Sequence, residues 1–144
     1  MKKTHRTLVW FRGKDLRLAD HEPLVRAAED GEVIPLFVFD PFFFHPLRAR
    51  KLPHRMQFLL ESITELSTSL ASLGSKLICV SGPSITMVPE LVERWGVTRV
   101  FAHRWTEPFG RRRDAKIAEA LPVPMILHEG ETLHPPGTLR TGKG

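Results

Sequence analysis

The fold is decided by residues 7–39, which read TLVWFRGKDLRLADHEPLVRAAEDGEVIPLFVF. Thr7–Phe11 and Val33–Phe39 are short, apolar and partly β-branched, which is typical of strands buried on both faces. Between them, Glu22–Glu29 has the pattern of a helix, and Asp30-Gly31 is a stop signal for it. The stretch therefore predicts a strand, a helix and a second strand.

The rest of the chain repeats this alternation. Apolar residues at intervals of three or four run from Met56 to Leu73 and predict the longest helix, which Gly74 closes. Further strands are expected at 77–80, 99–103 and 125–127, and further helices at 84–95 and 108–121. Strands that alternate with helices form right-handed crossovers and a parallel sheet. We therefore expect a doubly wound, Rossmann-like α/β fold with a five-stranded parallel sheet and helices on both faces. Pro35 predicts that pairing in the second strand begins only after it.

Length and composition bound the function. At roughly 150 residues per domain, 144 residues allow one domain. Hydrophobic residues make up 42% of the chain and charged residues 26%, which is an ordinary composition for a globular protein. No apolar run is long enough to cross a bilayer and no leader opens the chain, so we expect a cytoplasmic protein without membrane contact. The single cysteine, Cys79, fits a reducing compartment. A net charge of +5 is weak evidence for DNA binding, because acidic residues are interspersed among the basic ones.

In open α/β sheets, ligands bind beyond the carboxyl ends of the strands. The segments to examine are therefore 12–20, 40–53, 81–84 and 104–110. The first holds Arg12, Asp15, Arg17 and Asp20 with Lys14 among them. One interpretation is a salt-bridged turn, with the two aspartates paired to Arg12 and Arg17. In the other interpretation, the charged guanidinium of Arg12 points at a ligand or a neighbouring domain.

The segment after the fourth strand is the second candidate. Pro108 suits a first helical position, so Glu107 is expected at or just before a helix N-terminus, where a carboxylate is favourable. Alternatively, Glu107 accepts hydrogen bonds from a heterocyclic ring. Arg111–Arg113 are expected on a solvated helical surface, because consecutive helical residues do not share one face.

Several motifs are absent. Residues 137–143 (GTLRTGK) match a P-loop only up to Gly144, which stands where Ser or Thr is needed, so we regard the match as coincidence. No Gly-x-Gly-x-x-Gly follows the first strand, and Ser81 and Ser84 lack the nucleophile elbow of a hydrolase. The seven histidines lack metal-ligand spacing, so no metal site is predicted. The sequence shows no self-contained catalytic apparatus.

Residues 8–24 (LVWFRGKDLRLADHEPL) resemble the opening of the DNA photolyase and cryptochrome family. Further matches follow in the family's order: Phe39-Asp40-Pro41, Arg55 with Phe58 and Leu59, Leu73-Gly74 with Ser81-Gly82, and Glu107-Pro108-Phe109-Gly110 with Arg113-Asp114. The resemblance covers essentially the whole chain. It departs at Gly13-Lys14, where the family has one residue. We expect an α/β domain at 1–132 and, at 133–144, the start of a linker to a large helical domain that the chain lacks.

The resemblance implies a divided function. A whole photolyase uses light to repair pyrimidine dimers through a flavin adenine dinucleotide held in the helical domain. The α/β domain accommodates an antenna chromophore, either a reduced folate or a deazaflavin. The matching positions for antenna binding are Arg12, Phe39, Asp40, Arg55, Trp105 and Glu107. Phe39 and Trp105 would stack on the ring, Asp40 and Glu107 would accept its N–H groups, and Arg55 would pair with an anionic ring or tail. Deazaflavin-binding members often carry an acidic residue where Trp105 stands, so the antenna's identity stays open.

We therefore expect an antenna-binding domain with no catalytic residues of its own. Its expected partners are the antenna and the helical domain, with DNA contacted only through a full-length protein; the chain alone should be inactive in repair. One alternative is a stand-alone nucleotide-binding or stress-type α/β domain, although no phosphate-cradling Gly-rich turn is evident. Another is a photolyase-like domain with an empty antenna pocket that acts in signalling.

Overall fold

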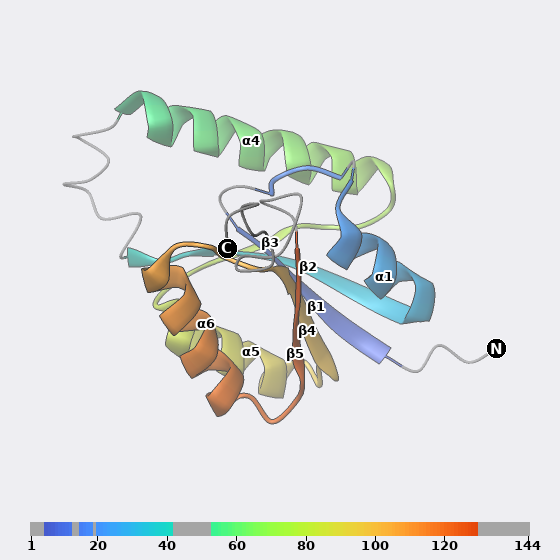
Figure 1. Cartoon of the computed structure of the whole chain (residues 1–144). Helices are drawn as coiled ribbons and strands as arrows, with labels where there is room; N and C mark the ends of the chain where they lie inside the picture. The colour runs from blue at the N-terminus through green and yellow to red at the C-terminus, as the bar shows by residue number, and fades with distance from the viewer. Residues whose placement is uncertain (1–4, 13–14, 19, 42–52, 130–144) are drawn as a thin grey trace, which may run out of the picture.

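The structure is a computed structural model that describes residues 5–12, 15–18, 20–41 and 53–129. In chain order, its elements are β1 (His5–Phe11), α1 (Glu22–Asp30), β2 (Gly31–Phe39), α4 (Pro53–Ser72), β3 (Ile78–Ser81), α5 (Ser84–Arg94), β4 (Arg99–His103), α6 (Pro108–Ala120) and β5 (Met125–His128). The strands form one five-stranded sheet in the order β3-β2-β1-β4-β5, and every pairing is parallel (Figure 1). The expected doubly wound α/β fold is confirmed.

Most expected element bounds lie within two residues of the observed ones, but the expectation for Pro35 was wrong. β2 pairs with β1 from Gly31 onward, and Pro35 itself lies opposite Val9. β3 pairs with β2 only from Leu36. At Pro35, β2 still has an open edge on the side of β3, and an open edge is where a strand tolerates a residue without an N–H.

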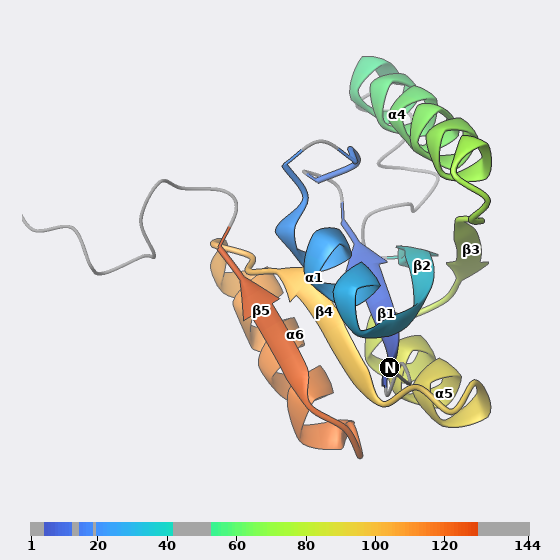
Figure 2. The same ribbon diagram turned by 90° about the vertical axis from the view of Figure 1, so that its right-hand side faces the viewer.

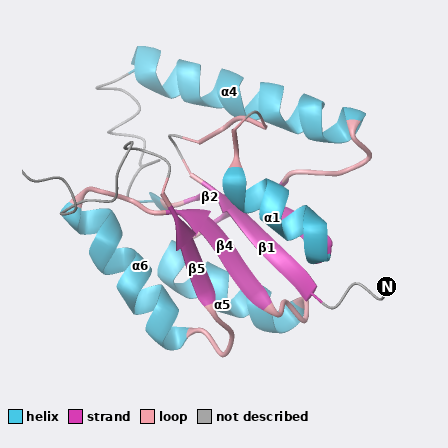
Figure 3. Cartoon of the chain, turned by 45° about the vertical axis from the view of Figure 1, so that its right-hand side comes forward, coloured by secondary structure: helices cyan, strands magenta, loops and turns pink. Residues whose placement is uncertain are grey.

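Helices cover both faces of the sheet, as Figures 2 and 3 show: α1 and α4 lie on one side, and α5 and α6 on the other. Each face has its own buried core. The α1/α4 side is built from Val9, Phe11, Ala27, Phe37, Ile63, Leu66, Leu70, Leu77 and Phe101. The α5/α6 side is built from Leu8, Trp10, Leu36, Val38, Val88, Leu91, Val92, Val97, Val100, Ala102 and Ile117. Alternate residues of β1 belong to opposite cores, as the two-residue period of a strand requires.

The strand order places β1 at the centre of the sheet, between β2 and β4. The chain leaves β1 toward β2 on one side and later returns to β4 on the other, so the edge beyond residue 11 is the switch point where such folds bind ligands. Within the described ranges, no helix is both long and apolar enough to span a membrane. The expected linker at 133–144 and the P-loop-like stretch at 137–143 lie outside the described residues.

Candidate functional site

A hollow of about 100 Å³ lies at the carboxyl ends of β1 and β2. It is lined by Trp10, Phe11, Arg12, Phe37, Val38, Asp40, Leu59, Ser84, Trp105 and Arg113. Strands, helices from both faces and the loop after β4 all contribute, which is what the switch point of a doubly wound sheet predicts. The lining combines aromatic rings, two arginines and a carboxylate, so the hollow offers flat apolar faces together with charge.

Arg12 is the most confined charge in this lining, since only 4% of the residue is exposed. Its Nη1 donates to both carboxylate oxygens of Asp114, at 2.6 and 2.8 Å, and its guanidinium lies 4.3 Å from the centre of the Trp10 ring. Its Nε and Nη2 are buried and have no hydrogen-bond partner among the described residues. Buried donors are seldom left unpaired in native proteins. Arg12 therefore has two N–H groups for which the described residues provide no acceptor.

A second guanidinium, that of Arg113, lies close to two tryptophan rings. Its central carbon is 5.0 Å from the Trp10 ring centre and 5.4 Å from that of Trp105. Burial lowers the pKa of Arg113, the positive charge of Arg12 lowers it further, and Asp114 opposes both. The guanidinium nevertheless stays protonated in any ordinary buffer. Two stacked cations and the aromatic faces beside them favour a planar, electron-rich or anionic ligand.

Asp40 borders the hollow from the end of β2. Its Oδ2 accepts hydrogen bonds from the Ser84 backbone N–H at 3.0 Å and from the Ser84 hydroxyl at 2.7 Å. The first turn of α5 leaves N–H groups without helical partners, and the carboxylate satisfies one of them. Asp40 thus joins the exit of β2 to α5 and is held in place at the rim of the hollow.

Trp105 also lines the hollow, and its position depends on Gly110 in the first turn of α6. A Cβ atom at Gly110 would overlap the Trp105 indole, with Cδ1, Cγ and Nε1 as its nearest neighbours. The absence of a side chain at Gly110 therefore leaves the space that the Trp105 indole occupies. Glycine is required here by close approach, not by an unusual backbone angle.

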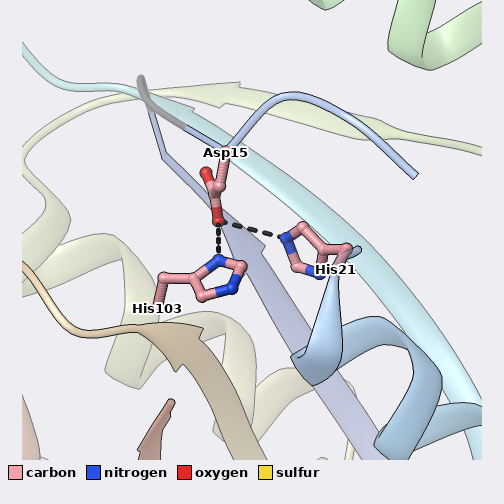
Figure 4. Close-up of side chains that lie close together, drawn as sticks. All are labelled: Asp15, His21 and His103. Carbon is pink, nitrogen blue, oxygen red and sulfur yellow. Dashed lines mark hydrogen bonds and ion pairs between the residues drawn. The ribbon is translucent and has the colours of Figure 1, made fainter. Parts of the chain in front are cut away.

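A buried charge cluster lies beside the hollow, at the same edge of the sheet. Asp15 Oδ2 accepts from His103 Nδ1 at 2.9 Å and from His21 Nε2 at 3.1 Å, so the carboxylate lies between the two rings (Figure 4). Its Oδ1 accepts the Arg12 backbone N–H at 2.6 Å. Burial alone would raise the pKa of Asp15, but the hydrogen bonds from His103, His21 and Arg12 outweigh it and lower the pKa from 3.8 to about 2. The cluster ties β1, α1 and β4 together.

Two histidines and an aspartate can ligate a metal by type, and the ligand atoms of Asp15, His21 and His103 lie within 4.8 Å of one another. However, His21 Nδ1 accepts the Leu24 N–H at 3.2 Å, which caps α1. The hydrogen of the neutral imidazole is therefore on Nε2, the atom that faces Asp15. A metal at Nε2 would have to displace this hydrogen, and moving it to Nδ1 would break the cap of α1. The arrangement is complete as a hydrogen-bonded cluster.

The structure brings three of the six predicted antenna residues around one hollow, namely Arg12, Asp40 and Trp105. The other three are not among the residues that line it. Phe39 is half-buried and packs edge-on against Phe37, with ring centres 5.0 Å apart. Arg55 is exposed in the first turn of α4, and Glu107 is the exposed N-cap residue of α6, as expected from its sequence position. Whether any of the six binds a ligand stays a prediction.

Two expectations about charged residues were wrong. Arg12 pairs with Asp114 in α6, and Asp15 pairs with two histidines, so the first turn is not the self-contained salt-bridged turn considered above. Arg113 is buried, while Arg111 and Arg112 are exposed as expected. The packing of α6 against the end of β1 accounts for the Arg12–Asp114 pair and for the burial of Arg113, whereas Asp15 meets side chains from the start of α1 and from β4. Lys14 and Gly13 lie outside the described residues.

Sequence reasoning missed Trp10 and Arg113 as lining residues and Asp114 as the partner of Arg12. Strand alternation could have identified Trp10, because it lies two residues before Arg12 and so shares its face of the sheet. Arg113 follows Gly110 by three residues, so the two lie on the same side of α6. This spacing could have indicated that Arg113 faces the protein and not the solvent. Nothing local signals the ion pair to Asp114, which is formed across 102 residues.

Comparison with known proteins shows which family this chain is similar to. Residues 7–144 match the sequence profile of the DNA photolyase family. A deoxyribodipyrimidine photo-lyase of Thermus thermophilus is 39% identical over 129 residues, which are 90% of this chain and 29% of that protein. The crystal structure of a class III photolyase from Agrobacterium tumefaciens matches 100% of this chain and 30% of its own, with a TM-score of 0.79 and 32% identity.

An archaeal photolyase from Sulfolobus tokodaii, described as holding two FAD molecules with the implication of a novel light-harvesting cofactor, matches 94% of this chain and 32% of its own. Its TM-score is 0.76 and its identity 26%. The chain thus spans about 30% of the length of these relatives. Sequence and fold agree over the sheet and its helices: the chain belongs to the DNA photolyase family and corresponds to its N-terminal α/β domain.

Proposed function

We propose that this chain is the antenna-binding domain of a photolyase-like protein, and that the hollow at the carboxyl ends of β1 and β2 takes a planar light-absorbing heterocycle. The observation that carries this proposal is the buried guanidinium of Arg12, a residue that lines the hollow and whose Nε and Nη2 have no hydrogen-bond partner among the described residues. The two classes of ligand that the family resemblance offers are a reduced folate and a deazaflavin.

The lining suits such a ring in several ways. Both ligand classes are flat and carry carbonyl oxygens and ring N–H groups. Arg12 would donate to a carbonyl oxygen, and its charge would strengthen that bond in a site this buried. The faces of Trp10 and Trp105 would stack on the ring or on the guanidinium that holds it. Asp40 would accept a ring N–H at the rim.

When bound, the antenna would absorb light and pass its excitation energy to a flavin. The residues of this chain would do no chemistry: they bind the ring, fix its orientation and exclude water from it. Light-driven repair of pyrimidine dimers, FAD binding and contact with DNA are proposed only for a longer protein that contains this domain. The chain alone should not repair DNA. The Sulfolobus tokodaii relative supports a light-harvesting role for the family, since its description names such a cofactor.

One observation favours a second candidate, a domain whose pocket holds no pigment. The hollow is about 100 Å³, whereas pockets for small molecules are usually about 300–1,000 Å³. In that case, the stacked arginines and tryptophans would serve only to join α6 to the sheet. Ligand titration separates the two candidates.

The test is a titration of the purified chain with 5-formyltetrahydrofolate, a deazaflavin and ATP, followed by tryptophan fluorescence and thermal shift. Arg12→Lys keeps a positive charge beside Asp114 but removes the planar guanidinium and its N–H donors. It should therefore weaken pigment binding about tenfold. Arg99→Lys is the matched control. Arg99 is also buried and lies 4.3 Å over a ring, that of Phe101, but it bonds Thr7 and Asp30 at the amino end of β4.

We expect a folate or a deazaflavin to bind saturably to the wild-type chain and to the Arg99→Lys variant, with no binding of ATP. Absence of saturable binding by either pigment would overturn the proposal and favour the domain without a pigment. Saturable binding of ATP alone would favour the nucleotide-binding alternative.

A further inference from the structure

The outer edge of β5 offers backbone groups to a further strand. Among the described residues β5 pairs only with β4, and Figure 2 shows it at the border of the sheet with α6 behind it. The strand β4 and the residue after it donate to the carbonyl oxygens of Pro124 and His128. Because successive residues of a parallel strand bond toward opposite sides, the N–H and C=O groups of Met125 and Leu127 point away from β4.

This edge lacks the features that usually prevent strand addition. Natural sheets protect an exposed edge with charged side chains, proline, a bulge or a covering element. The sequence of β5 is MILH, which contains no Lys, Arg, Asp, Glu or proline. Its register with β4 runs without a bulge from Met125 to His128, and Ile126 is 41% exposed. An edge of this kind is a template for pairing with another chain.

A groove of about 490 Å³ lies beside the edge and is lined by residues of α6, of β5 and of the loop after β4. Its apolar lining includes Met125 and Leu127, which are half-buried, and the small, exposed Ala115 and Ala118 of α6. The residues with outward backbone groups therefore also provide side chains to the groove. Its volume is in the usual range of binding sites, about 300–1,000 Å³.

The groove is positively charged. Three arginines line it, namely Arg104, Arg111 and Arg112. Arg104 donates to Glu129 at 2.6 Å, whereas the other two are exposed on α6 and form no ion pair with another described residue. The carboxylate among its described lining residues, that of Asp114, is already bound to Arg12. Two positive charges without an internal counter-charge complement an acidic partner.

We infer that the groove between α6 and β5 is a docking site for an extended acidic peptide segment of a partner protein, which adds to β5 as a further strand. Main-chain hydrogen bonds to Met125 and Leu127 hold its backbone, and alternate side chains face the groove, where carboxylates pair with Arg111 and Arg112. The opposite edge strand, β3, does not select such a partner. The hollow that Ile78 of β3 lines contains two arginines and two glutamates, so its charges cancel.

The probe is a fluorescein-labelled heptapeptide, Thr-Glu-Thr-Leu-Thr-Glu-Thr, which as a strand presents its two glutamates and its leucine on one face. Fluorescence polarisation should show saturable binding that weakens with added salt. The peptide with lysine in place of both glutamates should bind at least about tenfold more weakly. Two further peptides carry N-methyl groups on alternate residues, one on the threonines and one on the other three. Only one of these two should lose affinity, by about tenfold or more, because only one set of N–H groups faces β5.

The double variant Arg111→Glu/Arg112→Glu should weaken peptide binding at least about tenfold. Ala115→Leu should have a similar effect, because leucine covers part of the groove while its helix propensity is close to that of alanine. Lys76→Glu is the control for charge reversal, since Lys76 is exposed just before β3 at the opposite edge. It should leave the affinity unchanged.

No saturable binding of the acidic peptide would overturn the inference, and so would equal affinity in the wild-type chain and the double variant. An equal effect of the two N-methylated peptides would overturn strand addition. Analytical ultracentrifugation tests a second copy of the chain as the occupant. Self-association that Ala115→Leu abolishes, without peptide binding, would assign the groove to an interface between copies and also overturn the inference.

Discussion

Arg12 and Asp114 form a buried ion pair that joins the end of β1 to α6, with Arg12 Nη1 lying 2.6 and 2.8 Å from the two carboxylate oxygens. Both side chains are only 3% exposed. Because a single nitrogen of the guanidinium makes both contacts, Nε and Nη2 make no hydrogen bond to Asp114. The pair therefore holds the proposed ligand-binding group in place without using up its donors.

Removal of the acidic partner should be costly. Asp114→Asn leaves the Arg12 charge buried and uncompensated, which should lower the free energy of unfolding by about 3–5 kcal/mol. Urea denaturation followed by circular dichroism measures the change. Glu90→Gln is the control, because its ion pair with Arg94 at 3.3 Å is exposed and should contribute only about 0.3–0.5 kcal/mol. Similar losses in the two variants would contradict a special role for the buried pair.

Asp15 should make stability depend on pH in an acidic window. Its pKa is 3.8 when unperturbed and about 2 in the folded chain, so the folded state favours the ionised form. The resulting stabilisation is fully present above about pH 4 and is lost as the pH falls through about 2; it amounts to about 2 kcal/mol. Asp15→Asn should remove this part of the pH dependence, as measured by urea denaturation across that range.

Glu119→Gln serves as the control for the pH series, because Glu119 is an exposed carboxylate on α6. It should leave the slope of stability against pH unchanged. An identical slope in wild type and Asp15→Asn would show that the cluster does not hold the carboxylate in its ionised form.

His21 should act through its place at the start of α1. His21→Ala removes both the acceptor for the Leu24 N–H and a donor to Asp15, and it should lower the free energy of unfolding by about 2 kcal/mol or more. His21→Asn keeps a side-chain acceptor at the N-cap, so it should recover about 1 kcal/mol of that loss. His54→Ala, at an exposed position of α4, should stay within about 0.5 kcal/mol of wild type. Equal losses for the Ala and Asn variants at His21 would contradict the capping role.

The sheet and its order of elements were predictable because each strand is a compact apolar run and each helix ends at a local signal. Gly74 and Gly96, both with positive φ, follow α4 and α5 as expected of glycines at helix ends. The charged site was less predictable. Arg12 was found because it directly follows a buried strand, and ligands bind beyond the carboxyl ends of such strands, whereas Asp40 was named only through the family resemblance.

The partners of these residues could not be predicted, because they depend on how elements far apart in the sequence pack. Asp114 lies in α6, whose sequence predicts a solvated helical surface. It is buried because α6 packs close to β1. The same holds for His103, which ends β4 and meets Asp15 across 88 residues. Arg55, which the family resemblance suggested as a site residue, is exposed on α4, and its role stays a prediction.

A substitution at Gly110 tests whether the Trp105 indole packs directly against this residue. In a helix, Gly→Ala normally gains about 1 kcal/mol, but here the new Cβ would collide with the indole, and overpacking costs about 1–3 kcal/mol. Gly110→Ala should therefore destabilise the wild-type chain and stabilise the Trp105→Ala variant. A double-mutant cycle by thermal or urea unfolding measures this reversal of sign. The same stabilisation in both backgrounds would show that the indole does not rest on Gly110.

The most direct measurement of the central claim is a nitrogen-15 NMR titration of the labelled chain with 5-formyltetrahydrofolate. It reads the side-chain N–H groups of arginine and tryptophan, with Arg12→Lys and Trp105→Phe used for assignment. We predict saturable shifts of the Arg12 Nε–H and the Trp105 Nε1–H, while the signals of Arg99 and Trp95, at the other end of the sheet, stay in place. Shifts confined to Arg99 and Trp95, or none on saturation with this folate and, in a parallel titration, with a deazaflavin, would contradict a pigment site at the carboxyl ends of β1 and β2.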